Sequence, residues 1–208
     1  MKKVMLIGDS IRLGYQRVVE EELFNEFDVW GSEDNCRFAK YTLNELGRML
    51  KAFSKRENLK YEQAVLMPGE VSTPDMISPD IIHWNNGLWD TSIVCKEDGA
   101  FTPIDEYISY MSKILRELRK LTDKIIFATT TPVKPQNLNQ DNGIIAEYNR
   151  RIVEFMRTEG VMINDLNKIV SEDVDKYLAA DNIHLSDEGK ILCGKAVAEH
   201  IRKIEFGD

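Results

Sequence analysis

The stretch Met1-Lys-Lys-Val-Met-Leu-Ile-Gly-Asp-Ser10 decides the fold class of this chain. Its apolar run, residues 4–7, is too short for a helix and stops at Gly8, so it predicts a strand buried on both faces. A serine follows where the strand ends. Open α/β sheets bind ligands on loops beyond the carboxyl ends of parallel strands, which makes Ser10 a candidate catalytic residue. The alternative is an ordinary turn that caps a helix.

The rest of the chain alternates between helical and strand patterns. Amphipathic periodicity predicts helices at 13–27, 42–53, 103–121, 144–156 and 186–204, and Thr42 with Glu45 has the form of a capping box. Short apolar runs predict strands at 27–30, 81–84, 124–128 and 161–163, and residues 57–75 are expected to be irregular. This order predicts one domain, residues 1–208, with a three-layer α/β/α fold around a mainly parallel sheet of about five strands.

Composition narrows the classes of partner and compartment. The chain has 208 residues and a formal net charge of -8, which argues against nucleic acid or an anionic membrane as a partner. Its three cysteines, Cys36, Cys95 and Cys193, are far apart and favour a reducing compartment, so we expect a cytoplasmic protein. The amino-terminal apolar run is shorter than the core of a signal peptide, and no stretch approaches the ~20 apolar residues of a membrane span.

A second group of polar residues, Asp181-Asn-Ile-His184, precedes the last predicted helix. A serine hydroxyl needs a base to become a nucleophile, and histidine suits that work at neutral pH. Asp181 would then hold the other ring nitrogen of His184, as the acid of a Ser-His-Asp triad does. The alternative is a surface histidine beside a helix cap. Of the other histidines, His83 lies within a predicted strand and is expected in the core or at its rim, and His200 is expected to face solvent.

Acyl transfer also needs hydrogen-bond donors for the oxyanion, commonly backbone N–H groups and an asparagine amide. Asn85-Asn86-Gly87 follows the strand at 81–84, and Asp34-Asn35-Cys36-Arg37 follows the strand at 27–30. In a parallel sheet both segments would lie at the same edge as Ser10. Both can also be plain turns, because Asn, Asp and Gly are common turn residues.

Together these residues resemble the SGNH, or GDSL-type, hydrolase superfamily. The resemblance spans residues 4–200 and rests on Gly8-Asp9-Ser10, an asparagine at a strand end midway, and Asp-x-x-His before the final helix. It implies a flavodoxin-like sheet, with Ser10 as nucleophile, His184 as base and Asp181 as the orienting acid. It also implies an oxyanion hole formed by the N–H of Ser10, a backbone N–H after the second strand and an Asn side chain.

Two segments depart from the family pattern. Many members have a glycine after the second strand where this chain offers Asn35 or Cys36, either of which keeps a backbone donor. The run Trp84-Asn-Asn-Gly-Leu-Trp89 resembles the Asn-x-Gly-x-Trp variant of some carbohydrate O-acyl esterases and acetyltransferases, which favours Asn85 over Asn86 as the oxyanion side chain. Arg37, beside these donors, would either contact substrate or pair with an acid.

The sequence therefore predicts a serine esterase that removes a small acyl group, chiefly acetyl, from an alcohol oxygen of a sugar, with no metal or organic cofactor. Its partner would be a small-molecule ester, and its aromatic residues near the site, Trp84, Trp89 and Phe101, would either stack on the sugar or pack in the core or a lid. Alternatives are a lipase or thioesterase with the same triad, and a non-catalytic ligand-binding module of the same fold. A metal-dependent phosphotransfer site at Asp9 and Asp181 lacks further clustered acids.

Overall fold

A computed structural model describes residues 1–55 and 77–207 of the chain. Its centre is a five-stranded sheet in the order β2-β1-β3-β4-β5, in which every neighbouring pair is parallel. The strands are β1 (Lys2–Ile7), β2 (Phe27–Gly31), β3 (Ile81–Trp84), β4 (Ile125–Ala128) and β5 (Met162–Asn164). The predicted parallel sheet of about five strands is confirmed.

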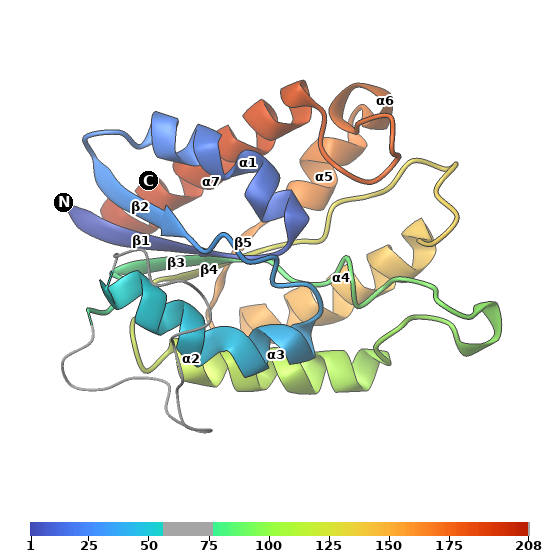
Figure 1. Ribbon diagram of the computed structural model, residues 1–208, viewed down its shortest axis with the longest axis horizontal. Helices are drawn as coiled ribbons and strands as arrows, with labels where there is room; N and C mark the ends of the chain where they lie inside the picture. The colour runs from blue at the N-terminus through green and yellow to red at the C-terminus, as the bar shows by residue number, and fades with distance from the viewer. Residues whose placement is uncertain (56–76, 208) are drawn as a thin grey trace.

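Helices cover both faces of this sheet (Figure 1). One layer contains α1 (Ser10–Glu22), α5 (Leu166–Ser171), α6 (Val174–Tyr177) and α7 (Asp187–Phe206). The other contains α2 (Ala39–Lys55), α3 (Ile104–Leu118) and α4 (Asn142–Thr158), and a 3-10 turn, Lys96–Asp98, lies in the loop before α3. The predicted three-layer α/β/α architecture is confirmed.

Alternation along β1 explains why its apolar run is continuous. Val4 and Leu6 belong to the core between the sheet and α1 and α7. Met5 and Ile7 belong to the opposite core, between the sheet and α2, α3 and α4. All four side chains are fully buried, as a central strand with a helix layer on each face requires.

The start of α2 differs from the capping box predicted at Thr42. The helix begins at Ala39, whose N–H donates to both carboxylate oxygens of Asp90 at 3.2 and 3.0 Å. Thr42 lies inside the helix, and its hydroxyl donates to the carbonyl of Cys36 at 2.8 Å. The capping-box prediction is wrong because the capping carboxylate comes from a residue distant in sequence. The prediction of irregular structure at 57–75 lies outside the described residues.

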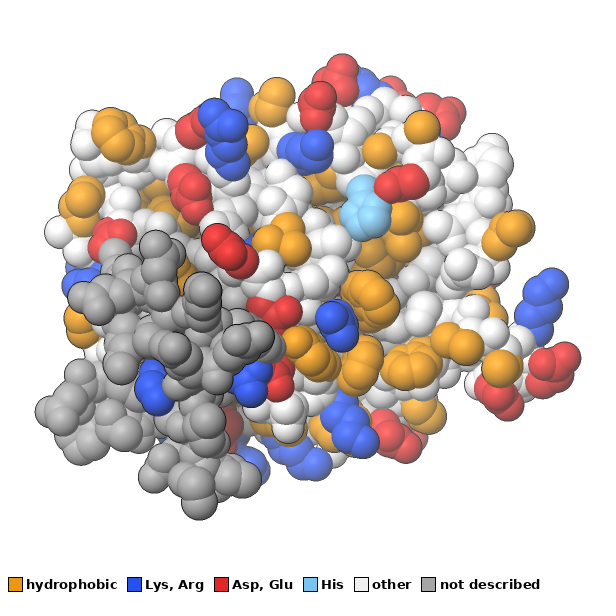
Figure 2. Space-filling view, in the orientation of Figure 1, with side chains coloured by type: hydrophobic (Ala, Val, Ile, Leu, Met, Phe, Trp, Pro, Cys, Tyr) orange, Lys and Arg blue, Asp and Glu red, His pale blue; other side chains and the backbone are white. Residues whose placement is uncertain are grey.

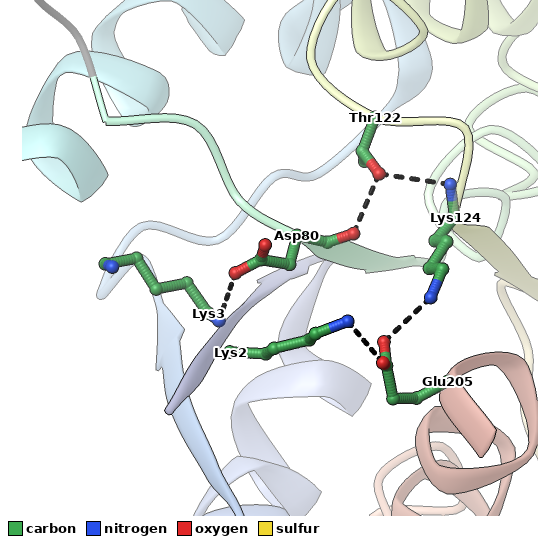
Figure 3. A network of polar contacts seen from close by, with 6 residues as sticks. All are labelled: Lys2, Lys3, Asp80, Thr122, Lys124 and Glu205. Carbon is green, nitrogen blue, oxygen red and sulfur yellow. Dashed lines mark hydrogen bonds and ion pairs between the residues drawn. The ribbon is translucent and has the colours of Figure 1, made fainter.

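Polar contacts fasten the amino ends of the strands to the end of α7 (Figure 3). Glu205 pairs with Lys2 of β1, and it accepts a 2.8 Å hydrogen bond from Lys124, which precedes β4. Asp80, just before β3, accepts the N–H of Lys3 at 2.7 Å and receives the Thr122 hydroxyl at its own carbonyl at 2.7 Å. Because these contacts occupy the amino ends of the strands, we expect the site among the loops at the opposite edge, where the strands have their carboxyl ends.

Candidate active site

Ser10 is the first residue of α1, directly after a tight turn at the end of β1. The side chain of Asp9 caps the helix by accepting the N–H of Ile11 at 3.0 Å. Gly8 is required at this turn because a Cβ there would lie 2.0 Å from Oδ1 of Asn85 and 2.7 Å from Cβ of Arg12. The first N–H groups of a helix lack intrahelical acceptors, so Ser10 lies where a negative charge is stabilised.

The structure brings Ser10, His184 and Asp181 together from opposite ends of the chain. His184 Nε2 lies 2.9 Å from Ser10 Oγ, and His184 Nδ1 lies 2.7 Å from Asp181 Oδ2. The other carboxylate oxygen of Asp181 accepts the N–H groups of Ile183 and His184 at 3.1 and 2.9 Å. This local turn fixes the acid and the imidazole relative to one another before α7 begins.

The electrostatics of Asp181 suit an orienting carboxylate. Burial raises its pKa, but the backbone N–H and side chain of His184 and the N–H of Ile183 outweigh that effect and lower the pKa to about 2. Asp181 is therefore ionised at neutral pH. A carboxylate at Nδ1 holds the ring proton there and leaves the lone pair of Nε2 facing the Ser10 hydroxyl.

The loop after β2 lies beside the Ser10 turn, as the sequence predicts. The N–H of Cys36 donates to the carbonyl of Gly8 at 3.2 Å, and the N–H of Arg37 donates to Oδ1 of Asn35 at 3.0 Å. The Cys36 side chain points into the core, where burial raises its pKa to about 11. Its thiol thus stays protonated and is no rival nucleophile.

Arg12 stabilises the loop after β2, a role that was not predicted from the sequence. Its buried guanidinium donates to the carbonyls of Ser32 and Asp34 at 2.5 and 2.6 Å, and more weakly to that of Gly8 at 3.3 Å. The signal in the sequence is a charged residue on the buried stripe of α1, three positions before Tyr15. A charge on such a stripe indicates specific internal acceptors.

Asn85 and Asn86 point to opposite faces of the sheet because they extend β3. The amide of Asn85 donates to Asp9 at 3.0 Å, and its Oδ1 accepts the Tyr15 hydroxyl at 3.2 Å. Asn86 instead supports the loop after β2 by donating to the carbonyl of Arg37 at 3.0 Å. Asn85 is thus attached to the residue next to Ser10, whereas Asn86 is attached to the neighbouring loop.

The chain resembles known proteins in its structure rather than in its sequence. The sequence matches no protein-family model, and no curated protein sequence matches it significantly. Among solved structures, it is similar to a lipase/acylhydrolase from Enterococcus faecalis, with a TM-score of 0.74 and 18% identity over 97% of this chain and 96% of that chain.

Two further structures show the same likeness. An acetyl xylan esterase superposes with a TM-score of 0.71 and 18% identity, covering 96% of this chain and 99% of that chain. A GDSL-like lipase from Bacteroides thetaiotaomicron VPI-5482 superposes with a TM-score of 0.69 and 14% identity, covering 97% of this chain and 88% of that chain. The chain has the SGNH-hydrolase fold. At these identities the likeness describes the fold of the chain.

Within this SGNH-hydrolase fold, a series of buried polar side chains leads to Asp9 of the Ser10 turn. His83 is fully buried, and burial lowers its pKa to about 3, so its ring is neutral. Its Nε2 lies 3.2 Å from the amide nitrogen of Asn164, which can only donate, and its Nδ1 lies 3.5 Å from the Tyr15 hydroxyl. The proton is therefore on Nδ1, and successive donors run from Asn164 through His83, Tyr15 and Asn85 to Asp9. This series of hydrogen bonds fixes the orientation of the Asn85 amide.

The aromatic residues near the SGNH-fold site divide between core and surface. Trp84 is fully buried and packs edge-on against Phe127 at 5.5 Å, so the interpretation that it stacks on a sugar is wrong. Trp89 and Phe101 are 41% and 50% exposed, and Phe101 packs against Phe38. Figure 2 shows hydrophobic side chains gathered across the middle of the face that carries these loops.

Two other residues singled out from the sequence can be placed in the SGNH-hydrolase fold. Arg37 is exposed, its guanidinium lies 4.9 Å from the centre of the Tyr41 ring, and no carboxylate in residues 1–55 and 77–207 pairs with it. His200 is half-buried and its Nδ1 lies 2.8 Å from the carbonyl of Ala196, so it faces solvent in part.

The described part of the chain contains neither a cluster of metal-ligating side chains nor a helix suited to cross a membrane. Over the ranges 1–55 and 77–207, no three or more His, Cys, Asp or Glu side chains converge as a metal site requires. Nor does any helix in these ranges combine the length and the apolar character needed to cross a membrane.

Proposed function

We propose that the chain is a serine esterase that hydrolyses small acyl esters, chiefly acetyl esters, on the hydroxyl groups of carbohydrates. The observation that carries the proposal is the hydrogen-bonded series from Ser10 Oγ to His184 Nε2, at 2.9 Å, and from His184 Nδ1 to Asp181, at 2.7 Å. A nucleophile, a base and an orienting acid in this geometry support acyl transfer. The proposed partner is a small ester or an acylated sugar, with no metal or organic cofactor.

The proposed reaction has two halves. Ser10 Oγ attacks the acyl carbon while His184 Nε2 takes the hydroxyl proton, and the charge of Asp181 stabilises the imidazolium. The tetrahedral intermediate then breaks its ester C–O bond, and His184 gives the proton to the departing alcohol. Water attacks the acyl-enzyme with His184 again as base, which releases the carboxylic acid and restores Ser10.

The negative oxygen of each intermediate needs donors close to Ser10. We assign the N–H of Ser10 and the second N–H of the Asn85 amide, whose first N–H is held by Asp9. The N–H of Asn35 or Cys36 would complete the hole. Cys36 donates to a neutral carbonyl at 3.2 Å, and an oxyanion is a stronger acceptor that would compete for that donor.

The acetyl and carbohydrate parts of the proposal are supported by a structural neighbour, a sequence motif and exposed aromatic side chains. One structural neighbour is described as an acetyl xylan esterase, and the sequence carries Asn-x-Gly-x-Trp at residues 85–89. Trp89 and Phe101 are exposed and offer apolar surface for the face of a sugar ring. A lipase or thioesterase would use the same triad and differ in acyl-chain preference.

The direct test is hydrolysis of p-nitrophenyl esters of increasing acyl length, followed by acetylated xylo-oligosaccharides. We expect acetate to be cleaved with the highest kcat/KM and the acetylated sugars to release acetate. A preference for octanoate or longer chains would favour the lipase alternative. No hydrolysis of any ester by folded protein would contradict the proposed function.

Asn85→Ala is expected to lower kcat for p-nitrophenyl acetate by about 10²–10³, because one oxyanion donor is lost. Asn86→Ala is the matched control, since that side chain supports the loop after β2 from the other face of the sheet. Steady-state kinetics and thermal unfolding are measured on both variants. A larger loss of kcat in the Asn86 variant would move the assignment to Asn86.

Tyr15→Phe is expected to lower kcat by about ten-fold with little change in KM, less than the loss in Asn85→Ala. The variant keeps the ring and removes the hydroxyl that donates to Asn85 Oδ1 at 3.2 Å, so the amide is less well oriented. The buried amide oxygen loses its donor, which costs roughly 1–3 kcal/mol of stability. Unchanged kcat in a destabilised Tyr15→Phe protein would show that the hydroxyl is structural only.

A further inference from the structure

A groove of about 670 Å³ lies between α2 and α3, which we call the α2–α3 groove. Its polar lining is mostly basic, with Lys40 on α2 and Lys113, Arg116 and Lys120 on or directly after α3. Figure 2 shows several Lys and Arg side chains, with Asp and Glu side chains among them, in the region of these two helices. Because the whole chain has a net charge of -8, this surface is opposite in sign to the molecule as a whole.

Part of this positive charge is not neutralised. Glu117, the one acid among the described lining residues, is shared between Lys120, with which it pairs, and Arg116 at 3.5 Å. Lys40 and Lys113 pair with no carboxylate in the described ranges 1–55 and 77–207. Unpaired cations on two facing helices attract an anionic ligand.

The unpaired cations of the α2–α3 groove flank an aromatic ring. The Lys40 and Lys113 ammonium groups lie 6.0 and 5.2 Å from the centre of the half-buried Tyr110 ring. Near the mouth of the groove, the Arg37 guanidinium lies 4.9 Å from the ring of Tyr41, which also lines it. Both ammonium groups lie over the Tyr110 ring, so the ring holds two cations close together where the carboxylate of a sugar acid can pair with them.

The groove adjoins the candidate active site. Phe38 lines it, and the neighbouring carbonyl of Arg37 is held by Asn86 at the end of β3. Cys36, two residues earlier, bonds to Gly8 of the turn that carries Ser10. The end of the groove at Phe38 therefore lies two residues along the chain from Cys36, which contacts the turn that carries Ser10.

The spacing of the cations indicates a long ligand. Lys113, Arg116 and Lys120 follow one side of α3 and its end over seven positions, which is roughly 10 Å at the rise of an α-helix. Charges distributed along a line match a polymer with a carboxylate on successive sugars. A compact polyphosphate would need its cations at one point.

We propose that the α2–α3 groove binds uronate residues of the polysaccharide whose acyl groups are removed at Ser10. The natural substrate is then an acylated acidic polysaccharide, whose carboxylates pair with Lys40 and Lys113 while an acyl group reaches the site. This assignment rests on the proposed function for its catalytic part. The binding part is measurable without catalysis.

Binding is tested with Ser10→Ala protein by affinity electrophoresis in gels that contain polygalacturonate or neutral, deacetylated arabinoxylan. We expect retardation by polygalacturonate that weakens as salt rises, and about ten-fold weaker retardation after Lys40→Gln with Lys113→Gln. The matched control is Lys168→Gln with Lys195→Gln, which removes the same charge from exposed residues of α5 and α7 on the opposite layer. Equal retardation of the two double variants would overturn the proposal.

Catalysis is tested with otherwise wild-type protein on acetylated polygalacturonate and acetylated xylan. We expect a higher kcat/KM on the acidic polymer, and a preference that falls about ten-fold in the Lys40/Lys113 variant and is kept in the control. Equal kcat/KM on both polymers would overturn the proposal, as would tighter binding of a compact polyphosphate, for which tripolyphosphate is the probe, than of polygalacturonate. Retardation by polygalacturonate in a protein that cleaves no ester would leave the groove assignment standing and reject the esterase function.

Discussion

Ser10→Ala is expected to lower kcat for p-nitrophenyl acetate on the order of 10⁶-fold, as removal of the nucleophile does in serine hydrolases. The hydroxyl is 2.9 Å from the base that would activate it, and no other described residue of the site can replace it. The fold should survive, because α1 is capped by the side chain of Asp9. Initial rates and thermal unfolding are measured on the same preparations.

The control for Ser10→Ala is Ser109→Ala, an exposed serine on α3 that is changed in the same way. It should keep the wild-type rate, which shows that a serine-to-alanine change does not by itself remove activity, and the residual rate of Ser10→Ala sets the limit on any contaminating esterase. Wild-type turnover in purified, folded Ser10→Ala protein would remove the proposed mechanism.

His184→Ala is expected to cost about as much as Ser10→Ala, again on the order of 10⁶-fold in kcat, because base and nucleophile act as one unit. For the same reason, the double variant Ser10→Ala with His184→Ala should lose no more than either single variant. Additive losses would show that the two side chains act separately. Kinetics of the three proteins under identical conditions decide between these outcomes.

The remaining histidines provide internal controls for His184→Ala. His200→Ala should keep most activity, since its Nδ1 contacts the helix carbonyl of Ala196 at 2.8 Å, away from the site. His83→Ala should lose stability more than kcat, because it empties a buried site and leaves Asn164 and Tyr15 without their partner. If either variant lost more kcat than His184→Ala, the assignment of the base would be wrong.

Much of the architecture can be predicted from local sequence. The run at residues 4–7 predicts a central strand because both of its faces are apolar, and the structure buries alternate residues in two separate cores. Ser10, Asp181 and His184 can be proposed as partners because each lies at the end of a strand or before a helix, where parallel sheets bring loops together. Their hydrogen bonds match that expectation in geometry, and their catalytic roles stay predictions.

Contacts between distant side chains could not be predicted in the same way. The start of α2 depends on Asp90, 51 residues from Ala39, and the loop after β2 depends on Arg12. A capping box and an amphipathic stripe are local patterns, so neither reveals a carboxylate or guanidinium that arrives from another element. For Trp84, where the sequence left sugar stacking and core packing open, the structure shows core packing.

The buried ring of His83 makes the stability of this fold dependent on proton uptake. In the folded chain its pKa is about 3, below the ordinary value of 6.5, because burial disfavours the charged ring. Below pH 6.5 the unfolded chain therefore binds one more proton at this residue, and His83 by itself favours unfolding by up to about 1.4 kcal/mol per pH unit until the pH approaches 3. Burial acts in the opposite sense on Asp90, whose pKa it raises to about 7. Asp181, with a pKa of about 2, stays ionised over that whole interval. Acid thus affects the buried groups beneath Asn85 before it discharges the carboxylate that orients His184.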